Sequence, residues 1–287
     1  MIWIGTILVV YFLVIVGVAW LSVHPVRTPL FLSPGAMELP QEDVEFTTAD
    51  GIRIRGWWMA AEGRQERKTV VILLHGYLMT RSELTPLGAR LWKQGCSCLL
   101  IDFRAHGSSG GKKCGVGWLE RLDVGAAMAW VREREPDARI VLIGSSMGAA
   151  ALSLAAAEFG GASALILDCG YSRLTSAALG WWRFIGGKWL ALAFAPTVLA
   201  AAPLVGVNPF KVDVARALTK ANLPTLLIHG ELDMLALPSE AERNLAACGD
   251  KGKLIWMPNS NHAEGRWIHP ELYENAVMAF LREHDLI

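Results

Sequence analysis

The fold of this chain is decided by the stretch Arg139-Ile-Val-Leu-Ile-Gly144-Ser145-Ser146-Met147-Gly148-Ala-Ala-Ala-Leu152. A short apolar run leads into Gly-x-Ser-x-Gly, and alanines and leucines with high helix propensity follow. This order predicts a strand, a sharp turn and a helix. In such a turn the serine is strained and stands at the end of the sheet, and the flanking glycines lack the Cβ atoms that would collide across it.

Two adjacent serines make the frame of the motif important. Only Ser146 has glycine two positions before it and two positions after it, so Ser146 is the candidate nucleophile and Ser145 is the spacer. Met147 begins the predicted helix, and its backbone N–H is expected to point at the reacting centre, where a helix N-terminus favours negative charge. Because Gly-x-Ser-x-Gly also occurs by chance, a turn of small residues without chemistry is the alternative.

The composition of the 287 residues fits one large domain or two small ones. The formal net charge is zero, so bulk electrostatics give no reason to expect a nucleic acid or an acidic partner. The cysteines are odd in number and form no Cys-x-x-Cys pair, which argues against a disulfide framework and against a metal site. Buried, reduced thiols are expected at Cys96, Cys98, Cys114, Cys169 and Cys248.

The N-terminal residues 1–23 carry no charged side chain. A run of this length can cross the hydrocarbon layer, about 30 Å thick, as a helix, and Trp3 and Trp20 lie near its ends, where their rings suit the membrane interface. The sequence therefore predicts a transmembrane anchor; a cleaved signal peptide, with Gly17-Val18-Ala19 as a weak cleavage site, is the alternative. Arg27 follows the span and no charged side chain precedes it, which favours a cytoplasmic catalytic domain.

Residues 24–43 contain four prolines and are predicted to form a linker without regular structure. The catalytic domain is expected to span 44–287. It opens with a β-hairpin around Asp50-Gly51, because glycine tolerates the positive φ that the turn requires. Trp57 and Trp58 are expected on opposite faces of the second strand, one in the core and one at the surface.

After the hairpin, apolar runs alternate with segments of helical periodicity. Buried strands are predicted at residues 69–74, 98–103, 164–167, 224–229 and 253–257, and helices at 84–94, 118–135, 238–248 and 270–284. This alternation predicts an α/β fold with a mostly parallel, doubly wound sheet. It is interrupted at residues 172–212 by an apolar insertion that we expect to form a lid. A second membrane span there is opposed by Arg183 and Lys188.

A serine hydroxyl becomes a good nucleophile when a neighbouring base takes its proton and a third group orients the base. Among the seven histidines, His262 follows the last strand and so returns to the carboxyl end of the sheet, where Ser146 stands. Asp233 occupies the loop after the preceding strand at the same end, and Asp168, one strand earlier, is the reserve carboxylate. The chain order Ser146, Asp233, His262 is the order expected with this motif.

Five segments together make the chain resemble the α/β-hydrolase superfamily from about residue 44 to the end, and most closely its membrane-tethered serine hydrolases. The segments are Leu73-Leu-His75-Gly76-Tyr77, Asp102-Phe-Arg-Ala-His-Gly-Ser-Ser-Gly110, Gly144-Ser-Ser146-Met-Gly148, His229-Gly-Glu-Leu-Asp233 and Asn261-His262. One departure is Ala105, which stands where many relatives have glycine.

The resemblance implies an α/β-hydrolase fold with a catalytic triad of Ser146, His262 and Asp233. It also implies that Tyr77, the residue after His-Gly, supplies the second backbone amide of an oxyanion hole beside that of Met147. Each such donor is typically worth about 3 kcal/mol in the transition state. The segment 102–110 is expected to be a structural loop that braces this side of the site rather than a metal site. Neither a metal nor an organic cofactor is implied.

The expected reaction is acyl transfer to water by a serine hydrolase, which cleaves carboxylic esters or thioesters, acyl lipids among them, through an acyl-enzyme intermediate. The expected partners are a small-molecule ester or acyl-lipid substrate and a membrane held through the N-terminal helix, with no nucleic acid. A serine peptidase of the same fold and a catalytically inactive, membrane-tethered scaffold are the alternatives. The lid sequence does not choose a substrate, because a fold does not fix a function.

Overall fold

A single sheet organises the protein, which a computed structural model describes over residues 2–61 and 68–287; residue 1 of the predicted anchor lies outside these ranges. The strands are β1 (Glu42–Thr47), β2 (Arg53–Met59), β3 (Thr69–Leu74), β4 (Ser97–Asp102), β5 (Arg139–Ser145), β6 (Ala164–Asp168), β7 (Thr225–Gly230) and β8 (Gly252–Met257). Their spatial order is β1-β2-β4-β3-β5-β6-β7-β8. β2 is antiparallel to both of its neighbours, whereas the strands from β4 to β8 are all parallel. The predicted mostly parallel α/β sheet is therefore confirmed.

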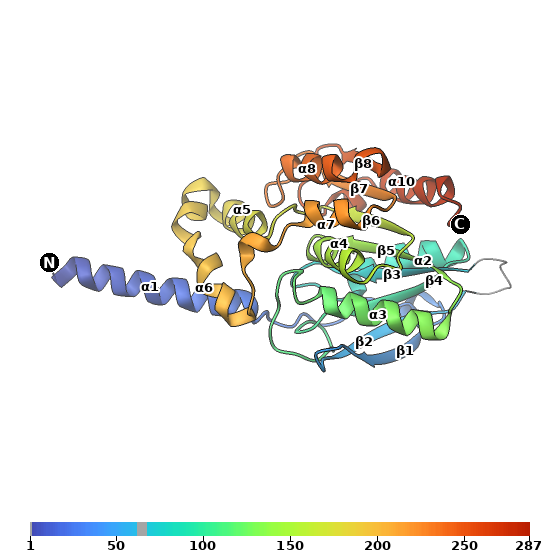
Figure 1. The fold of residues 1–287 in the computed structure, drawn as a ribbon, viewed down its shortest axis with the longest axis horizontal. Helices are drawn as coiled ribbons and strands as arrows, with labels where there is room; N and C mark the ends of the chain where they lie inside the picture. The colour runs from blue at the N-terminus through green and yellow to red at the C-terminus, as the bar shows by residue number, and fades with distance from the viewer. Residues whose placement is uncertain (1, 62–67) are drawn as a thin grey trace.

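Helices cover both faces of this sheet (Figure 1). The helices are α1 (Ile2–Val23), α2 (Thr85–Lys93), α3 (Arg121–Arg134), α4 (Met147–Phe159), α5 (Leu174–Phe194), α6 (Pro196–Val205), α7 (Val214–Ala221), α8 (Pro238–Cys248), α9 (Gly265–Ile268) and α10 (Pro270–Glu283). Alternate residues of each strand face opposite layers. Val70, Ile72 and Leu74 of β3 pack with α3, α4 and α7, while Val71 and Leu73 pack with α2 and α10.

The predicted β-hairpin is present as β1 and β2, joined by a turn in which Gly51 has φ +81°. The expectation that one of the two tryptophans of β2 lies at the surface is wrong. Trp57 and Trp58 point to opposite faces, yet both are buried, because the guanidinium of Arg81 lies over one ring and Trp130 of α3 packs against the other. Alternation of side chains along a strand shows which residues share a face. It does not show whether one face of an edge hairpin or both are covered.

The apolar insertion forms α5 and α6, which meet at an angle of 81°. α5 is itself interrupted at Gly186 and Gly187, whose backbone angles are not helical. The sharp bend means that this region is not a straight second span. α7, which the sequence analysis did not anticipate, then leads back to β7 and packs against α4. The insertion therefore stands at the end of the domain where α1 is attached (Figure 1).

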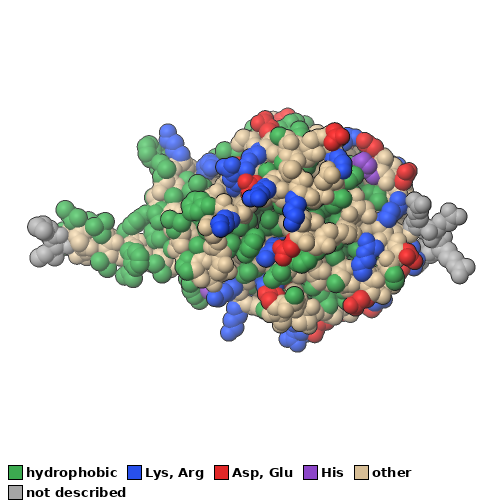
Figure 2. Space-filling view, viewed as in Figure 1, with side chains coloured by type: hydrophobic (Ala, Val, Ile, Leu, Met, Phe, Trp, Pro, Cys, Tyr) green, Lys and Arg blue, Asp and Glu red, His purple; other side chains and the backbone are tan. Residues whose placement is uncertain are grey.

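α1 projects from the domain as a long apolar helix (Figure 1). Within the described residues, Trp3–Val23 is the one helix that is by itself long and apolar enough to cross a membrane; the bent pair of α5 and α6 is a second candidate only if it is counted as one span. Figure 2 shows hydrophobic side chains gathered over α1 and the adjoining end of the domain, whereas charged side chains are spread over the rest of this face. Ile15, Ala19 and Val23 form one buried stripe, since the last turns of α1 pack against α6.

The predicted linker has little regular structure, but it is not a free tether. Only a single 3-10 turn interrupts it, at Gly35–Met37, before β1 begins at Glu42. The guanidinium of Arg27 donates hydrogen bonds to the backbone carbonyls of His106, Gly107, Ser109 and Gly111. The Thr28 hydroxyl donates to the carbonyl of Leu78. The linker thus runs along the domain beside the loops that follow β3 and β4.

Candidate active site

Ser146 lies at the turn between β5 and α4, as the motif predicts. Its backbone has φ 51° and ψ −107°, a conformation that a residue with a side chain adopts only under strain. A Cβ on Gly148 would overlap the carbonyl oxygen of Leu74, and a Cβ on Gly144 would overlap the backbone of Gly148. The two glycines therefore allow the strand, the turn and the helix to pack closely enough to hold the serine in this conformation.

The structure brings Ser146, His262 and Asp233 together in one chain of hydrogen bonds. The Ser146 Oγ lies 2.9 Å from the His262 Nε2, and the His262 Nδ1 lies 2.7 Å from the Asp233 Oδ2. The other carboxylate oxygen of Asp233 accepts from the backbone N–H groups of Leu235 and Ala236. Asp233 is fully buried, while the imidazole of His262 keeps a small exposed edge. The aspartate is thus fixed and the histidine can reach both the serine and the solvent side.

Ser145 and the reserve carboxylate Asp168 belong to a different network of polar contacts, centred on Arg266. The Ser145 hydroxyl accepts a hydrogen bond from Arg266, and Asp168 forms an ion pair with the same arginine at 3.3 Å. Asp168 therefore does not orient His262. The sequence analysis missed Arg266, which also forms an ion pair with Glu83 at 2.6 Å, and the second carboxylate oxygen of Glu83 accepts the N–H of Gly76. Burial alone would lower the pKa of Arg266, but Glu83 and Asp168 beside it raise that pKa above its ordinary value.

The two predicted oxyanion donors both line the cavity that contains Ser146. Met147 is the first residue of α4, with Ser146 as its N-cap. Among the described residues, neither the Met147 nor the Tyr77 amide has a hydrogen-bond partner within the chain. The next amide along, that of Leu78, donates to the Nε2 of His106 at 3.3 Å, which fixes the loop that carries Tyr77.

Three other histidines near the sheet edge are structural. The His75 Nδ1 donates to the carbonyl of Gly76 while its Nε2 accepts the N–H of Phe103. The His106 Nδ1 donates to the Arg104 carbonyl, and the His229 Nε2 donates to the Ala236 carbonyl. Burial lowers the pKa of all three, that of His106 to about 3. Burial thus favours the neutral form of all three, and both ring nitrogens of His75 and His106 are engaged.

The loop 102–110 is held by hydrogen bonds within the loop and by others from Arg27 and Arg81. One carboxylate oxygen of Asp102 accepts the Arg81 amide and the other accepts the amide and hydroxyl of Ser108. Ala105, the departure from the family pattern, has φ 61°. Glycine adopts this left-handed conformation without the steric cost that alanine pays.

Among residues 2–61 and 68–287, one cluster has donor atoms close enough to hold a metal ion: those of Cys169, Asp233 and His262 lie within 4.8 Å of one another. Hydrogen bonds already occupy these atoms. The Cys169 sulfur accepts the N–H of Ala263, and the carboxylate and imidazole belong to the chain that ends at Ser146. Burial raises the pKa of the Cys169 thiol, so the thiolate that a metal prefers is disfavoured. The donor set fits a hydrogen-bonded site better than a metal site.

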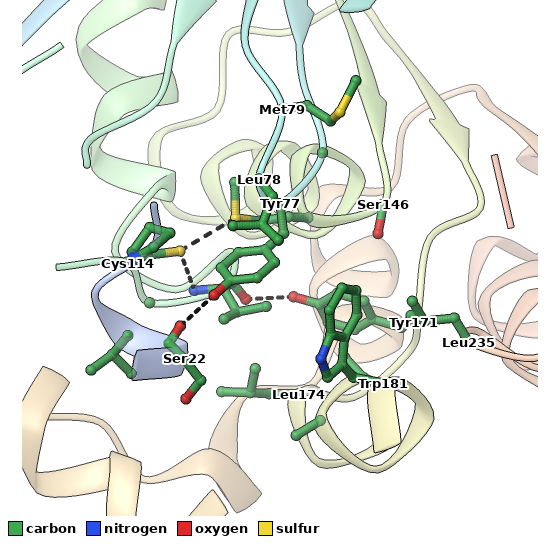
Figure 3. Close-up of a pocket in the computed structure, with 18 of the residues that line it drawn as sticks. Ser22, Tyr77, Leu78, Met79, Cys114, Ser146, Tyr171, Leu174, Trp181 and Leu235 are labelled. Carbon is green, nitrogen blue, oxygen red and sulfur yellow. Dashed lines mark hydrogen bonds between the residues drawn. The ribbon is translucent and has the colours of Figure 1, made fainter. Parts of the chain in front are cut away.

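Ser146 opens into a cavity of about 770 Å³. Figure 3 shows Ser146, Tyr77, Tyr171 and Trp181 around this space, with Ser22 of α1 hydrogen-bonded to the Tyr77 side chain. The lining is almost entirely apolar and comes from α1, the loops after β3 and β4, α5 and α6. An apolar cavity with a few convergent polar groups is the usual form of a small-molecule site.

Residues 65–209 match the protein family described as "Serine aminopeptidase, S33". This range includes Ser146 but ends before Asp233 and His262. Two relatives at 25% identity are the uncharacterized protein YfhR of Salmonella typhi, matched over 260 residues, and the uncharacterized protein Rv2307c of Mycobacterium tuberculosis, matched over 244 residues. Each match covers 84% of this chain, with 81% of the first relative and 79% of the second.

Among solved structures, an esterase of Pyrococcus furiosus superposes with a TM-score of 0.75 at 28% sequence identity. The match covers 92% of this chain and 98% of the esterase. An α/β hydrolase from a Penicillium species, GrgF, has the same fold with a TM-score of 0.68 at 20% identity. The family match over half of the chain and these shared folds make the protein a hydrolase of the α/β-hydrolase superfamily, and it belongs to the family described as "Serine aminopeptidase, S33".

Proposed function

We propose that the protein is a serine hydrolase that cleaves carboxylic esters or thioesters through Ser146, His262 and Asp233. The observation that carries this proposal is the unbroken hydrogen-bond chain from the Asp233 carboxylate through the imidazole to the Ser146 Oγ, at 2.7 Å and 2.9 Å, at the wall of an apolar cavity. In this arrangement the aspartate selects the tautomer with hydrogen on Nδ1, which leaves Nε2 free to accept the proton of the serine.

The reaction follows from these positions. His262 takes the Ser146 proton as the oxygen attacks the carbonyl carbon, and the amides of Tyr77 and Met147 donate to the oxyanion of the tetrahedral intermediate. The protonated imidazole then gives its proton to the leaving alcohol or thiol, and an acyl-enzyme remains. Water, deprotonated by the same imidazole, attacks the acyl carbonyl and restores the serine. Every proton is carried by His262, so the cycle needs no cofactor.

An ester fits the cavity better than the free amino terminus of a peptide, the second candidate raised by the family description. A substrate ammonium group needs an available carboxylate. Two glutamates line the cavity: both oxygens of Glu83 are engaged by Gly76 and Arg266, whereas the exposed Glu264 uses one oxygen for the N–H of Asn261, so the preference for an ester rests on the apolar lining. The apolar lining favours an acyl chain.

The placement of the protein is a further part of the proposal. Residues 1–23 are proposed to be a transmembrane anchor, 24–43 the connecting linker and 44–287 the catalytic domain, with the insertion 172–212 as its lid. The length and apolar surface of Trp3–Val23 support the anchor. Arg27, which follows the span, supports a cytoplasmic position of the domain.

The test uses the full-length protein in detergent with a fluorophosphonate probe, which reacts with activated serines. We expect labelling of wild type and of Ser145→Ala, and none of Ser146→Ala. Labelling that persists in Ser146→Ala would reject the assigned nucleophile. No labelling of folded wild type would favour a catalytically inactive scaffold. Parallel assays with p-nitrophenyl esters and aminoacyl p-nitroanilides then separate an esterase from a peptidase.

A further inference from the structure

The end of α1 is part of the wall of the active-site cavity. Val18, Leu21, Ser22 and Val23 line the same cavity as Ser146. Two hydrogen bonds fix this end of the helix to the catalytic domain: the Tyr77 hydroxyl donates to the Ser22 carbonyl, and the Cys114 amide donates to the Val23 carbonyl, both at 2.8 Å (Figure 3 shows the first). A helix that only anchored the domain would have no need of contacts beside the oxyanion loop.

The facing part of the wall comes from the two helices of the insertion. Apolar side chains of α5 and α6 line the cavity, namely Leu174, Ala177, Ala178, Trp181, Trp182, Val198, Ala201, Ala202 and Val205. Four of these residues are alanines, whose short side chains leave room for the cavity beside the contact of α1 with α6. The cavity of about 770 Å³ is within the range that encloses most of a drug-sized ligand, roughly 300–1,000 Å³.

The geometry of α1 sets the depth of this cavity relative to a bilayer. Its 22 residues are about 33 Å long, close to the hydrocarbon thickness of about 30 Å, so spanning requires nearly the whole helix. The last two turns of α1 pack against α6. A bilayer that covers these turns therefore also reaches α6 and the rim of the cavity. The outer surface of the insertion suits such contact, with exposed side chains at Phe184, Ile185, Trp189, Leu192 and Leu199.

We infer that the cavity is a binding site for one fatty-acyl chain of a membrane lipid ester, which enters from the bilayer and lies against the end of α1. This inference rests on the proposed function only for the position of the ester carbonyl at Ser146. The last turns of α1 then determine the length of chain that the enzyme accepts. A methylene that enters an apolar site adds about fourfold in affinity or in kcat/KM.

The first test measures chain-length selectivity of the full-length protein in nanodiscs of diether lipids, which contain no ester bonds. Wild type should show kcat/KM for p-nitrophenyl esters that rises from acetate to long chains. Val18→Trp and Ala178→Trp, both in the cavity wall, should lower the ratio of long-chain to short-chain kcat/KM at least tenfold. Val16→Trp, the same substitution on an exposed position of α1 outside the cavity, is the matched control and should keep the wild-type ratio. Identical profiles for Val18→Trp and Val16→Trp would overturn the inference.

The second test does not depend on catalysis. Ser146→Ala protein in the same nanodiscs is photolysed with a palmitic acid analogue that carries a terminal diazirine, and the cross-links are mapped by mass spectrometry. Cross-links in the cavity segments 114–116 and 171–178 that Val18→Trp weakens and Val16→Trp does not would support the acyl site. Cross-links confined to the exposed surface of α1 would contradict it.

Together the two tests distinguish a failure of the proposed function from a failure of the acyl-chain site. Cavity cross-links without esterase activity in wild type would retain the acyl site and reject the proposed function. Esterase activity with no change of chain profile in either cavity variant would retain the proposed function and reject the acyl site.

Discussion

At the scale of single residues, Arg266 connects three parts of the site that are far apart in sequence. It contacts Glu83, Ser145 and Asp168, and Glu83 in turn holds the amide of Gly76, next to the proposed oxyanion donor Tyr77. Glu83 and Asp168 are buried, and only 9% of the Arg266 side chain is exposed. A buried ion pair gains its stability from complete pairing, so the loss of one member leaves an uncompensated charge.

Arg266→Gln is therefore expected to lower the free energy of unfolding by about 3–5 kcal/mol. The double variant Glu83→Gln/Arg266→Gln should lose less stability than the sum of the two single changes. In Arg266→Gln the buried Glu83 carboxylate has lost its cation, and the second change removes that uncompensated charge. Urea denaturation of the detergent-solubilised protein measures all three variants. Additive single and double costs would show that Glu83 and Arg266 do not act as a pair.

Sequence patterns found the residues of the candidate triad but not this network. Ser146, Asp233 and His262 each follow a predicted parallel strand, so the topology alone brings them to one edge. Arg266 and Glu83 are 183 positions apart and carry no motif. Their pairing depends on how the short helix α9 packs against the turn after β3, which no local periodicity records.

At the scale of elements, the turn between β5 and α4 depends on close packing of backbone. α4 passes so near β3 that a Cβ on Gly148 would also lie 2.8 Å from the carbonyl oxygen of His75. Such an overlap can be relieved only if the helix moves away from the sheet, and that movement would displace Ser146 and the Met147 amide.

Gly148→Ala is expected to destabilise the protein by about 3 kcal/mol and to reduce fluorophosphonate labelling at Ser146 at least tenfold. The matched control is Gly88→Ala in α2, where a new Cβ would stay at 3.5 Å or more from its neighbours. Because alanine favours a helix by up to about 1 kcal/mol over glycine, this control should be neutral or stabilising. Thermal unfolding and the rate of fluorophosphonate labelling measure both variants. Equal effects of Gly148→Ala and Gly88→Ala would contradict the close-packing explanation.

Some element boundaries were predicted well, in one case because a strand is buried on both faces and in the other because a proline begins the helix. The strand at 69–74 and the helix at 238–248 have the bounds that the apolar runs and Pro238 indicate. The insertion was predicted only as an apolar lid, because its composition does not specify the bend between α5 and α6. Beside this bend the insertion contacts α1: α6 packs against it, and the Tyr11 hydroxyl donates to the Ala193 carbonyl, 182 positions later in the sequence.

At the scale of the whole molecule, buried neutral histidines link stability to pH. The Nε2 atoms of His75 and His106 accept backbone N–H groups, and protonation would replace each hydrogen bond with a repulsion between two N–H groups. With His229 they have a folded-state pKa below the usual 6.5. The unfolded chain therefore takes up protons below pH 6.5 that the folded protein refuses. Burial raises the pKa of Asp123 to about 7, so the folded protein binds a proton there that the unfolded chain does not. This proton offsets part of the uptake by the histidines.

Between pH 6 and pH 5 the unfolded His106 therefore binds a proton that the folded His106 does not, which lowers the free energy of unfolding by up to about 1.4 kcal/mol per pH unit as the pH decreases; His75 and His229 act in the same direction and Asp123 in the opposite one. His106→Gln should reduce the slope by up to about 1.4 kcal/mol per unit, because the variant has no ring to protonate. Urea titrations at several pH values measure the slope. Equal slopes for wild type and His106→Gln would contradict the prediction.

The connection between α1 and the catalytic domain is fixed by hydrogen bonds. Arg27 holds the connecting chain to four carbonyls, and the helix end is itself bonded to the loops beside Ser146. With α1 across a bilayer, the domain can turn about the membrane normal, but it cannot swing outward. Ser146 then stays at one fixed height above the lipid as the domain rotates. If the proposed function and the anchor hold, the enzyme hydrolyses acyl bonds at that height and not chemically identical bonds held further from the membrane.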